Sequence, residues 1–201
     1  MYNKVKRLLD IFFSLICLPF FALLFVLISF FIKKEDKGPV FYKSERLGKD
    51  AKIFKMYKFR SMKVNSKLLI NNDGSTYNSS DDLRVTKIGR IIRETSIDEV
   101  PQLINVLKGD MSFVGPRASL VIALKSYKDD EVDKMKVKPG ITGLTQAYYR
   151  NNIPNREKRL KDAWYANNQT FILDLKIVFK TLQTVLKKDN LYSNQNSEDI
   201  L

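Results

Sequence analysis

The sequence predicts an α+β protein, mostly helical, with a membrane-inserted helix at its N-terminus and a small β-hairpin. Three observations predict this fold class. Residues 11–32 form a long uncharged apolar run, residues 39–62 combine aromatic and β-branched residues around a turn, and much of the chain after residue 83 has helical periodicity. The chain has 201 residues, enough for one domain with its own core and an appended segment.

The membrane segment, residues 11–32, reads IFFSLICLPFFALLFVLISFFI. Ser14 and Ser29 are its only polar side chains, and the run reaches the roughly 20 residues that a helix needs to cross the hydrocarbon. Pro19 lies near its middle, where the missing N–H removes a backbone hydrogen bond and bends the helix. Lysine and arginine flank the run on both sides, whereas a spanning helix usually has them mainly on one side. These features fit a re-entrant helix bent at Pro19 and also a spanning helix.

After the membrane segment, residues 39–62 predict a β-hairpin that turns at the sequence GKDA. Lys55, Lys58 and Arg60 make this hairpin basic. The next stretch, residues 64–82, is rich in Asn, Ser and Asp, which is typical of a mobile loop.

Helical periodicity resumes beyond the loop. A proline and a glycine interrupt it and predict a turn at residues 137–143. The pattern predicts helices at residues 83–95, roughly 99–108, 118–136 and 156–168.

Residues 171–188 predict an amphipathic helix that carries several lysines. One reading is a helix whose apolar face packs on the core, and the other is a helix in the membrane interface with its lysines near anionic lipid heads. The residues that share its apolar face are Leu175, Val178, Leu182, Val185 and Leu186.

Composition divides the chain into three parts. We expect residues 1–36 to form the membrane-inserted helix, residues 37–188 to form a cytoplasmic domain, and residues 189–201 to be a polar, disordered tail. The sequence contains no zinc-ligand spacing, no phosphate-binding glycine loop and no dinucleotide-binding motif.

The charge balance indicates an anionic partner. There are 35 Lys and Arg against 22 Asp and Glu, a formal net charge of +13, which suits nucleic acid, an acidic membrane face or a phosphorylated substrate. Cys17 is the single cysteine, so no intramolecular disulfide can form, as expected in a reducing compartment. The chain has no histidine, which excludes the commonest general base. Any catalysis must therefore use carboxylates, Lys, Tyr or Cys17.

The sequence SIDEVPQ places Asp98 and Glu99 side by side in an apolar frame. One interpretation is a capping box, with Ser96 as N-cap and Glu99 three residues later. Pro101 is tolerated only if the helix starts close to Asp98. Neighbours on a helix project about 100° apart, so these two carboxylates are badly placed to share a proton. They are better placed to divide roles, one attacking and the other holding a metal or orienting a partner.

Three arginines predict phosphate binding. Arg93 precedes the carboxylates, Arg117 follows a Gly-Pro turn, and Arg150 follows a further glycine-containing loop. The planar guanidinium suits phosphate oxygens better than the lysine ammonium does. Each arginine alone is more typical of a surface salt bridge, but three beside a carboxylate pair and a membrane segment favour an anion site.

These motifs resemble those of the bacterial sugar transferases, the small monotopic phosphoglycosyl transferases, over about residues 2–188. The segments that carry the resemblance are KRLLD, YKFRSM, LRVTKIGRIIRETSIDEVPQLINVLKGDMSFVGPR, VKPGITG and LDLKI. The resemblance implies transfer of a phospho-sugar from a UDP-sugar to polyprenyl (undecaprenyl) phosphate, with release of UMP. The product would initiate synthesis of a glycoconjugate such as a capsule, exopolysaccharide, O-antigen or glycoprotein glycan.

The resemblance also implies roles for the motif residues. Asp98 would be the nucleophile that forms a covalent phosphosugar intermediate, and Glu99 would work with magnesium, so that the metal lies at this carboxylate pair. Arg93, Arg117 and Arg150 would bind substrate phosphate or anion groups.

The architecture implied by the resemblance is a re-entrant helix bent at Pro19, with amphipathic interface helices around a cytoplasmic catalytic core. The protein would lie in the bacterial inner (cytoplasmic) membrane, with its catalytic domain on the cytoplasmic face. Its partners would be the UDP-sugar donor, the polyprenyl phosphate acceptor and membrane lipids, with no nucleic acid, and a homodimer is compatible with this architecture.

The chain departs from the family pattern at three residues near the expected sugar and nucleotide region, and its segment QAYYRNN lacks the family's frequent glycine just before Arg150. Ala118 follows Arg117 where the family usually has proline, and Leu144 and Thr145 stand where tryptophan and alanine are frequent. We expect these positions to bear on donor choice. The alternative to an enzyme is a non-catalytic, membrane-tethered scaffold that binds anions or lipid. The net charge of +13 is the observation that suggests it.

Overall fold

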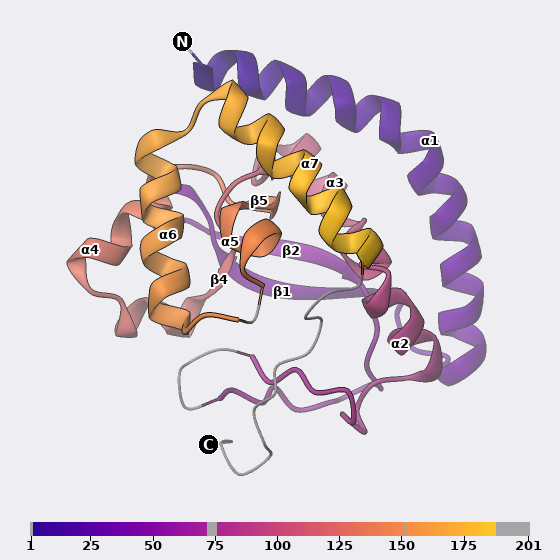
Figure 1. The fold of residues 1–201 in the computed structure, drawn as a ribbon. Coiled ribbons are helices and arrows are strands. Elements are labelled where there is room, and N and C mark those ends of the chain that lie inside the picture. The colour runs from indigo at the N-terminus through magenta and orange to yellow at the C-terminus, as the bar shows by residue number, and fades with distance from the viewer. Residues whose placement is uncertain (1, 72–75, 151, 188–201) are drawn as a thin grey trace.

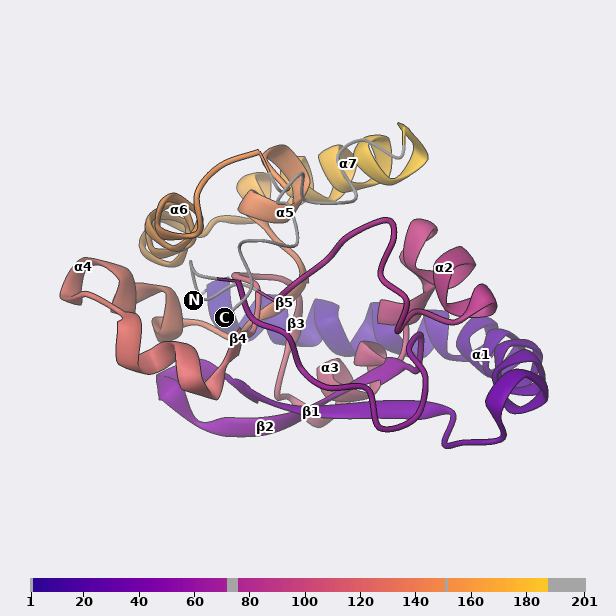
Figure 2. The same cartoon turned by 90° about the horizontal axis from the view of Figure 1, so that it is seen from below.

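The computed structural model describes residues 2–71, 76–150 and 152–187. It is mostly helical with two small sheets, which confirms the coarse fold class (Figure 1). Figure 2 shows the hairpin on one side of the molecule and α5, α6 and α7 on the other, with α3 and the second sheet between them. The predicted tail, residues 189–201, lies outside the described residues.

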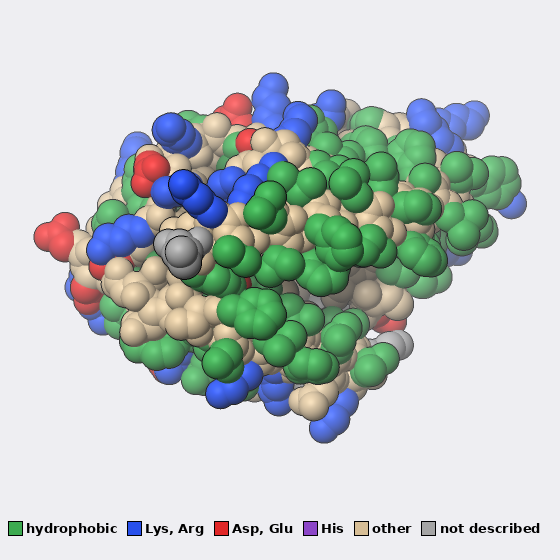
Figure 3. All heavy atoms as spheres, turned by 90° about the horizontal axis from the view of Figure 1, so that it is seen from above, with side chains coloured by type: hydrophobic (Ala, Val, Ile, Leu, Met, Phe, Trp, Pro, Cys, Tyr) green, Lys and Arg blue, Asp and Glu red, His purple; other side chains and the backbone are tan. Residues whose placement is uncertain are grey.

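Helix α1, Tyr2–Asp36, is the long apolar helix predicted at the N-terminus. Pro19 lies inside it, and Figure 1 shows that the helix changes direction about half-way along. Most of its apolar side chains are exposed. Within the described part of the chain, it is the one helix long and apolar enough to cross a membrane by length and composition. Figure 3 shows hydrophobic side chains gathered over this side of the molecule.

The N-terminal end of α1 is attached to the rest of the fold by charged groups. Lys6 forms an ion pair with Asp174 of α7, Phe171–Lys187. Asp10 is buried and accepts hydrogen bonds from the Ser112 hydroxyl at 3.0 Å and from the next backbone N–H at 3.1 Å. The KRLLD motif therefore connects the membrane segment to the core.

The C-terminal end of α1 is attached to the same folded unit. The Glu35 carboxylate accepts the first backbone N–H groups of α2, Lys87–Glu94, at 2.7 and 3.0 Å. This contact satisfies donors that a helix start leaves unpaired. Asp36 pairs with Arg60, and Ile32 is buried against the end of the hairpin.

The β-hairpin consists of β1, Phe41–Leu47, and β2, Ile53–Phe59, paired in antiparallel register. A short 3₁₀ turn, Lys49–Ala51, joins them, so the predicted hairpin is confirmed. Strand β4, Ser119–Leu120, adds to the free edge of β1. One face of the hairpin packs on the core through Met56.

The second sheet is a parallel pair, β3, Ser112–Val114, and β5, Gly140–Thr142. It requires close backbone contact, because a Cβ at Gly140 would lie 2.1 Å from the backbone nitrogen of Gly115. The region predicted as a turn, residues 137–143, therefore continues into a strand.

Several predicted helices are confirmed with shifted ends. Helix α6, Asn155–Asn168, matches its prediction closely. Helix α2 begins at Lys87 rather than residue 83, because Val85 is held in an isolated bridge with Met62 and Thr86 caps the helix with its side chain. Helix α3, Gln102–Lys108, is followed by Gly109 with φ of 89°, and its last carbonyl groups accept from Arg7 of α1 at 2.5 and 2.8 Å.

The single helix predicted at residues 118–136 is wrong. This segment contains β4, a 3₁₀ stretch Val121–Ser126, α4 Asp129–Val132 and a second 3₁₀ stretch Asp133–Lys136. The edge of β1 holds its start in an extended conformation, and Tyr127 is extended with φ −76° and ψ 139°. Tertiary pairing therefore overrides the helical pattern.

Helix α7 presents its predicted apolar face outward. Four of the five residues of that face, Leu175, Val178, Leu182 and Leu186, are exposed, and the fifth, Val185, is partly buried. The side that packs on the core instead carries Asp174, Ile177 and Thr184. The core-facing alternative for this apolar face is therefore wrong.

The segment predicted as a loop contains no helix or named strand among its described residues, 64–71 and 76–82. An isolated bridge joins Ile70 to Thr76.

Candidate active site

The SIDEVPQ segment forms a tight turn rather than a capped helix. Ser96 adopts the left-handed conformation, with φ of 57°, and its side chain makes no capping hydrogen bond. Ile97–Glu99 form a 3₁₀ turn, and α3 begins at Gln102 with Pro101 immediately before it. The predicted capping box is therefore wrong, whereas Pro101 does lie at a helix start, where its missing N–H is tolerated.

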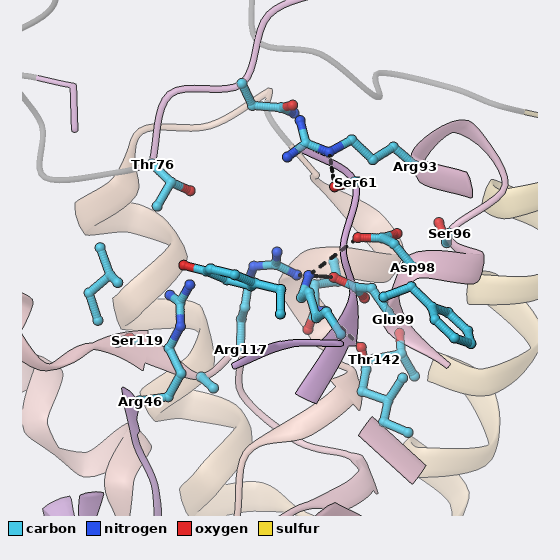
Figure 4. A pocket seen from close by; sticks show the side chains of 18 of the residues that line it. Arg46, Ser61, Thr76, Arg93, Ser96, Asp98, Glu99, Arg117, Ser119 and Thr142 are labelled. Atoms are coloured by element: carbon cyan, nitrogen blue, oxygen red, sulfur yellow. Dashed lines mark hydrogen bonds and ion pairs between the residues drawn. The ribbon is translucent and has the colours of Figure 1, made fainter. Parts of the chain in front are cut away.

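Lys58 of β2 lies between the two carboxylates. Its Nζ is 2.5 Å from Oε1 of Glu99 and 3.8 Å from Oδ2 of Asp98. Arg117 approaches the same Glu99 oxygen, with Nη1 at 3.4 Å (Figure 4). Because the Glu99 carboxylate pairs with Lys58 and Arg117, it does not cap the turn.

Burial and charge give the two carboxyl groups opposite pKa shifts. Burial raises the pKa of Asp98, and the nearby Glu99 charge adds to this effect while Lys58 opposes it. Burial also acts to raise the pKa of Glu99, but Lys58 and Arg117 outweigh it and lower the pKa to about 2. Glu99 is thus held ionised, while Asp98 is the more basic carboxyl group. This difference fits the divided roles expected from the sequence.

The three predicted arginines line one cavity with the carboxylates, a space of about 1630 Å³. Arg93 comes from α2, and its Nε donates to the Ser61 hydroxyl at 2.8 Å. Arg150 follows α5, Leu144–Tyr148, with φ of 44°. The structure therefore brings all five predicted site residues together.

Close packing positions Arg93. A Cβ at Gly89 would lie 1.9 Å from the Ser61 carbonyl oxygen, so α2 can approach Ser61 only with a glycine at this position. Ser61 then accepts from Arg93 one turn further along the helix.

The cavity lining includes both apolar and charged side chains. Cys17, Phe20 and Phe21 of α1 contribute apolar lining. Arg46 of β1 and Lys134 contribute charged groups to it. The carboxylate pair lies in the same cavity, which therefore connects the membrane helix to the charged groups.

The sequence reasoning missed Lys58 and Arg46 as site residues. The sequence indicates Lys58 only as part of a basic hairpin, although it lies in the YKFRSM motif. Arg46 lies four residues from Tyr42, the residue opposite Lys58 in the hairpin register, so both face the same side of the sheet. Strand alternation was the signal that could have found both.

The three departures from the family pattern have different surroundings. Ala118 is buried with Met56 in a core cluster and also lines the cavity. Leu144 packs against another core cluster. Thr145 lines the cavity and donates its hydroxyl to Asp162 at 2.9 Å. The departures therefore lie at or just behind the cavity wall.

The carboxylate pair fits the donor chemistry of magnesium when phosphate is also present. No group of three or more His, Cys, Asp or Glu side chains in the described ranges is arranged to hold a metal. Magnesium, however, is commonly held by one or two carboxylates together with substrate phosphates and water. Asp98 and Glu99 supply two carboxylates, and Glu99 is ionised.

The long apolar helix and the cation-rich carboxylate site together indicate a membrane-associated protein that binds an anionic ligand. A family model described as bacterial sugar transferase matches residues 1–188. The chain belongs to the bacterial sugar transferase family.

Individual relatives agree with this assignment. The chain is 40% identical over 199 residues to the undecaprenyl-phosphate galactose phosphotransferase of Salmonella typhimurium, covering 94% of this chain and 42% of the relative. It is 40% identical over 185 residues to the UDP-glucose:undecaprenyl-phosphate glucose-1-phosphate transferase of Klebsiella pneumoniae, covering 88% and 39%. It is 39% identical over 187 residues to the uncharacterized sugar transferase EpsL of Bacillus subtilis, covering 93% and 90%. The chain thus spans less than half the length of the first two relatives and nearly all of the third.

Replacement of Lys58 tests the electrostatics of the site. Lys58→Met leaves the buried Asp98 and the partly buried Glu99 without their shared cation, so we expect the free energy of unfolding at pH 7 to fall by on the order of 3 kcal/mol. The pKa of Glu99 is lowered from 4.5 to about 2 in the folded protein. The stability that this shift contributes is present above about pH 4.5 and is lost as the pH falls toward 2. Denaturant unfolding should be measured for both proteins across this pH range. The difference in free energy of unfolding between Lys58→Met and wild type should become smaller at low pH.

The control is Lys55→Met, on the same strand but exposed. We expect it to change the free energy of unfolding by less than about 0.5 kcal/mol. Equal effects of the two substitutions at every pH would contradict the stabilising role of Lys58.

Proposed function

We propose that this chain transfers a sugar phosphate from a UDP-sugar to undecaprenyl phosphate, releasing UMP and initiating polysaccharide synthesis. One observation carries the proposal: Asp98 and Glu99 share a cavity with Lys58 and several arginines, and apolar side chains of α1 also line this cavity. The printed names of the Salmonella and Klebsiella relatives, which describe transfer to undecaprenyl phosphate, support it.

The proposed reaction has two displacements at one phosphorus atom. In the first, an oxygen of ionised Asp98 attacks the phosphorus that carries the sugar. A bond forms between them, the bond to the bridging oxygen breaks, and its electron pair leaves with UMP. In the second, a phosphate oxygen of undecaprenyl phosphate attacks the same phosphorus, and Asp98 regains its carboxylate. Covalent catalysis divides one difficult transfer into two easier steps, and neither step requires a histidine.

The surroundings of Asp98 suit a nucleophile. Burial raises its pKa, which makes the ionised carboxylate more basic than an exposed aspartate. Lys58, 3.8 Å away, opposes this shift and favours the ionised form. Arg93 and Arg117 add positive charge where the donor diphosphate would bind.

Magnesium, when bound, would neutralise diphosphate charge, with Asp98 and Glu99 as its protein ligands. Lys58 and Arg117 both contact Oε1 of Glu99 and hold this carboxylate ionised and oriented.

The first test is substitution of the proposed nucleophile. Asp98→Asn keeps the size of the side chain but removes the attacking anion, so we expect UMP release from the UDP-sugar to fall at least about a thousand-fold. Continued release by the wild type, beyond one UMP per protein molecule, should require undecaprenyl phosphate, and release should require magnesium. Asp129→Asn, an exposed aspartate in the first turn of α4, serves as the control and should retain full activity.

Wild-type rates in Asp98→Asn would reject the nucleophile assignment. A folded wild-type protein that releases no UMP from any UDP-sugar would instead favour a non-catalytic scaffold.

We also propose that the acceptor reaches Asp98 along α1. Cys17, Phe20 and Phe21 lie on one face of the helix, and all three line the cavity. An isoprenoid chain fits this apolar wall, with its phosphate directed toward the carboxylates.

Blocking this wall tests the acceptor path. Cys17→Trp places a large ring in the apolar wall that α1 contributes to the cavity. We therefore expect kcat/KM for undecaprenyl phosphate to fall about ten-fold or more, while KM for the UDP-sugar stays unchanged. The control is Ile16→Trp, because Ile16 is exposed on α1 and is not part of the cavity wall. Similar losses from both variants would refute the path.

We propose further that α1 is re-entrant and that α7 lies in the membrane interface on the cytoplasmic side. Both ends of α1 are attached to one folded unit, at Asp10 and at Glu35. This attachment of both ends to one unit supports a helix that enters and leaves the membrane on one face. The exposed apolar face of α7 supports its interfacial position.

The topology has a direct test. In a Cys17→Ser background, we expect Lys4→Cys and Lys34→Cys both to react with a membrane-impermeant maleimide in inverted inner-membrane vesicles. Neither should react in intact spheroplasts. Labelling of the two positions from opposite sides would establish a spanning helix instead.

A further inference from the structure

Arg46 occupies a distinctive position in the wall of the cavity. It lies in β1, opposite Phe54 of β2 and Leu120 of β4, and its side chain is partly buried. Its Nε donates to Ser44 at 3.2 Å, and its guanidinium borders the cavity. Figure 4 shows it on the same side of the pocket as Arg117 and Ser119.

The charge environment of Arg46 is unusual. Across the described ranges, no carboxylate oxygen lies within 4 Å of its guanidinium, so it is not half of an ordinary salt bridge there. Burial, followed by the neighbouring Arg117, lowers the pKa of Arg46 to about 10. Two guanidinium groups held near each other repel, and this repulsion is relieved when an anion binds between them.

Arg46 lies on the far side of the carboxylate pair from Arg93. Lys58 bridges Asp98 to Glu99, and Arg117 contacts Glu99. Figure 4 shows Arg93 beyond Asp98 and Arg46 beyond Arg117. Across the cavity, Arg46 therefore lies away from Asp98 and next to Arg117, the arginine that contacts Glu99.

This order matters for an in-line displacement at phosphorus. The attacking oxygen and the leaving oxygen lie on opposite sides of the phosphorus atom. With Asp98 on one side, the leaving phosphate is expected on the side of Arg117. A cation there meets the negative charge that develops as the bond breaks.

We propose that Arg46, with Arg117, forms the subsite for the phosphate of the departing nucleoside monophosphate. The inference rests on the proposed transfer and assigns one of its product contacts. As the bond from phosphorus to the bridging oxygen breaks, the electron pair stays on that oxygen, which becomes a terminal oxygen of UMP. The planar fork of Arg46 donates N–H groups to this phosphate.

Direct binding of UMP tests the subsite without requiring turnover. Wild-type protein in lipid nanodiscs is titrated with UMP and with uridine by calorimetry. Arg46→Gln should raise the Kd for UMP about 10- to 100-fold, because a charge-assisted contact is lost. The weak affinity for uridine, which has no phosphate, should stay unchanged. Arg46→Lys keeps the charge without the fork and should give an intermediate Kd.

The matched control is Arg90→Gln, an exposed arginine of α2 outside the cavity wall. It should leave the Kd for UMP unchanged. Thermal melting checks that each variant folds, and UMP should raise the Tm of Arg46→Gln less than that of wild type.

The outcomes separate this inference from the proposed function. A Kd for UMP within two-fold of wild type in Arg46→Gln overturns the subsite while leaving the transfer intact. Equal weakening of UMP and uridine assigns Arg46 to the nucleoside and overturns the phosphate contact. A wild type that binds UMP but releases none from any UDP-sugar overturns the transfer, and the comparison of Arg46 variants still reports on the phosphate contact.

Discussion

The attachment of both ends of α1 to one folded unit is the constraint on which the rest of the structure depends. Asp10 binds the start of β3 near one end, and Glu35 caps α2 at the other. Between these contacts the helix bends and leaves most of its apolar side chains exposed. This closed arrangement brings a face of the membrane helix into the wall of a cavity that also contains Asp98. The position of α1 and the geometry of the candidate site therefore depend on the same contacts.

Much of the fold could be predicted because its signals are local. Apolar run length predicts α1, aromatic and β-branched residues around a turn predict the hairpin, and helical periodicity predicts α6 and α7. Local signals fail where distant pairing decides the structure. The edge of β1 holds Ser119 extended where the pattern indicates a helix. Glu99 fits a capping box by spacing, but its carboxylate instead accepts a hydrogen bond from Lys58, which is 41 residues away in sequence.

In the candidate site, too, local sequence signals predict some features, while others depend on residues distant in the sequence. Motif spacing is sufficient to select Asp98, Glu99 and the three arginines, which all line one cavity. It cannot show that Lys58 lies between the carboxylates, since that contact depends on how the hairpin packs against α3. The opposite pKa shifts of the two neighbours also depend on this packing, because one cation lies 2.5 Å from Glu99 but 3.8 Å from Asp98. Adjacent residues of similar chemistry thereby acquire different properties.

The ion pair between Lys6 and Asp174 has a consequence for biosynthesis. Its partners are 168 residues apart, so α1 pairs with α7, the last helix among the described residues. Closing so long a loop is slow compared with forming local contacts. During translation, Lys6 has no partner until α7 has been synthesised, whereas Arg7 and Asp10 can already contact α3 and β3. A chain that stops before α7 therefore retains the contacts of Arg7 and Asp10 but lacks the ion pair that joins α1 to α7.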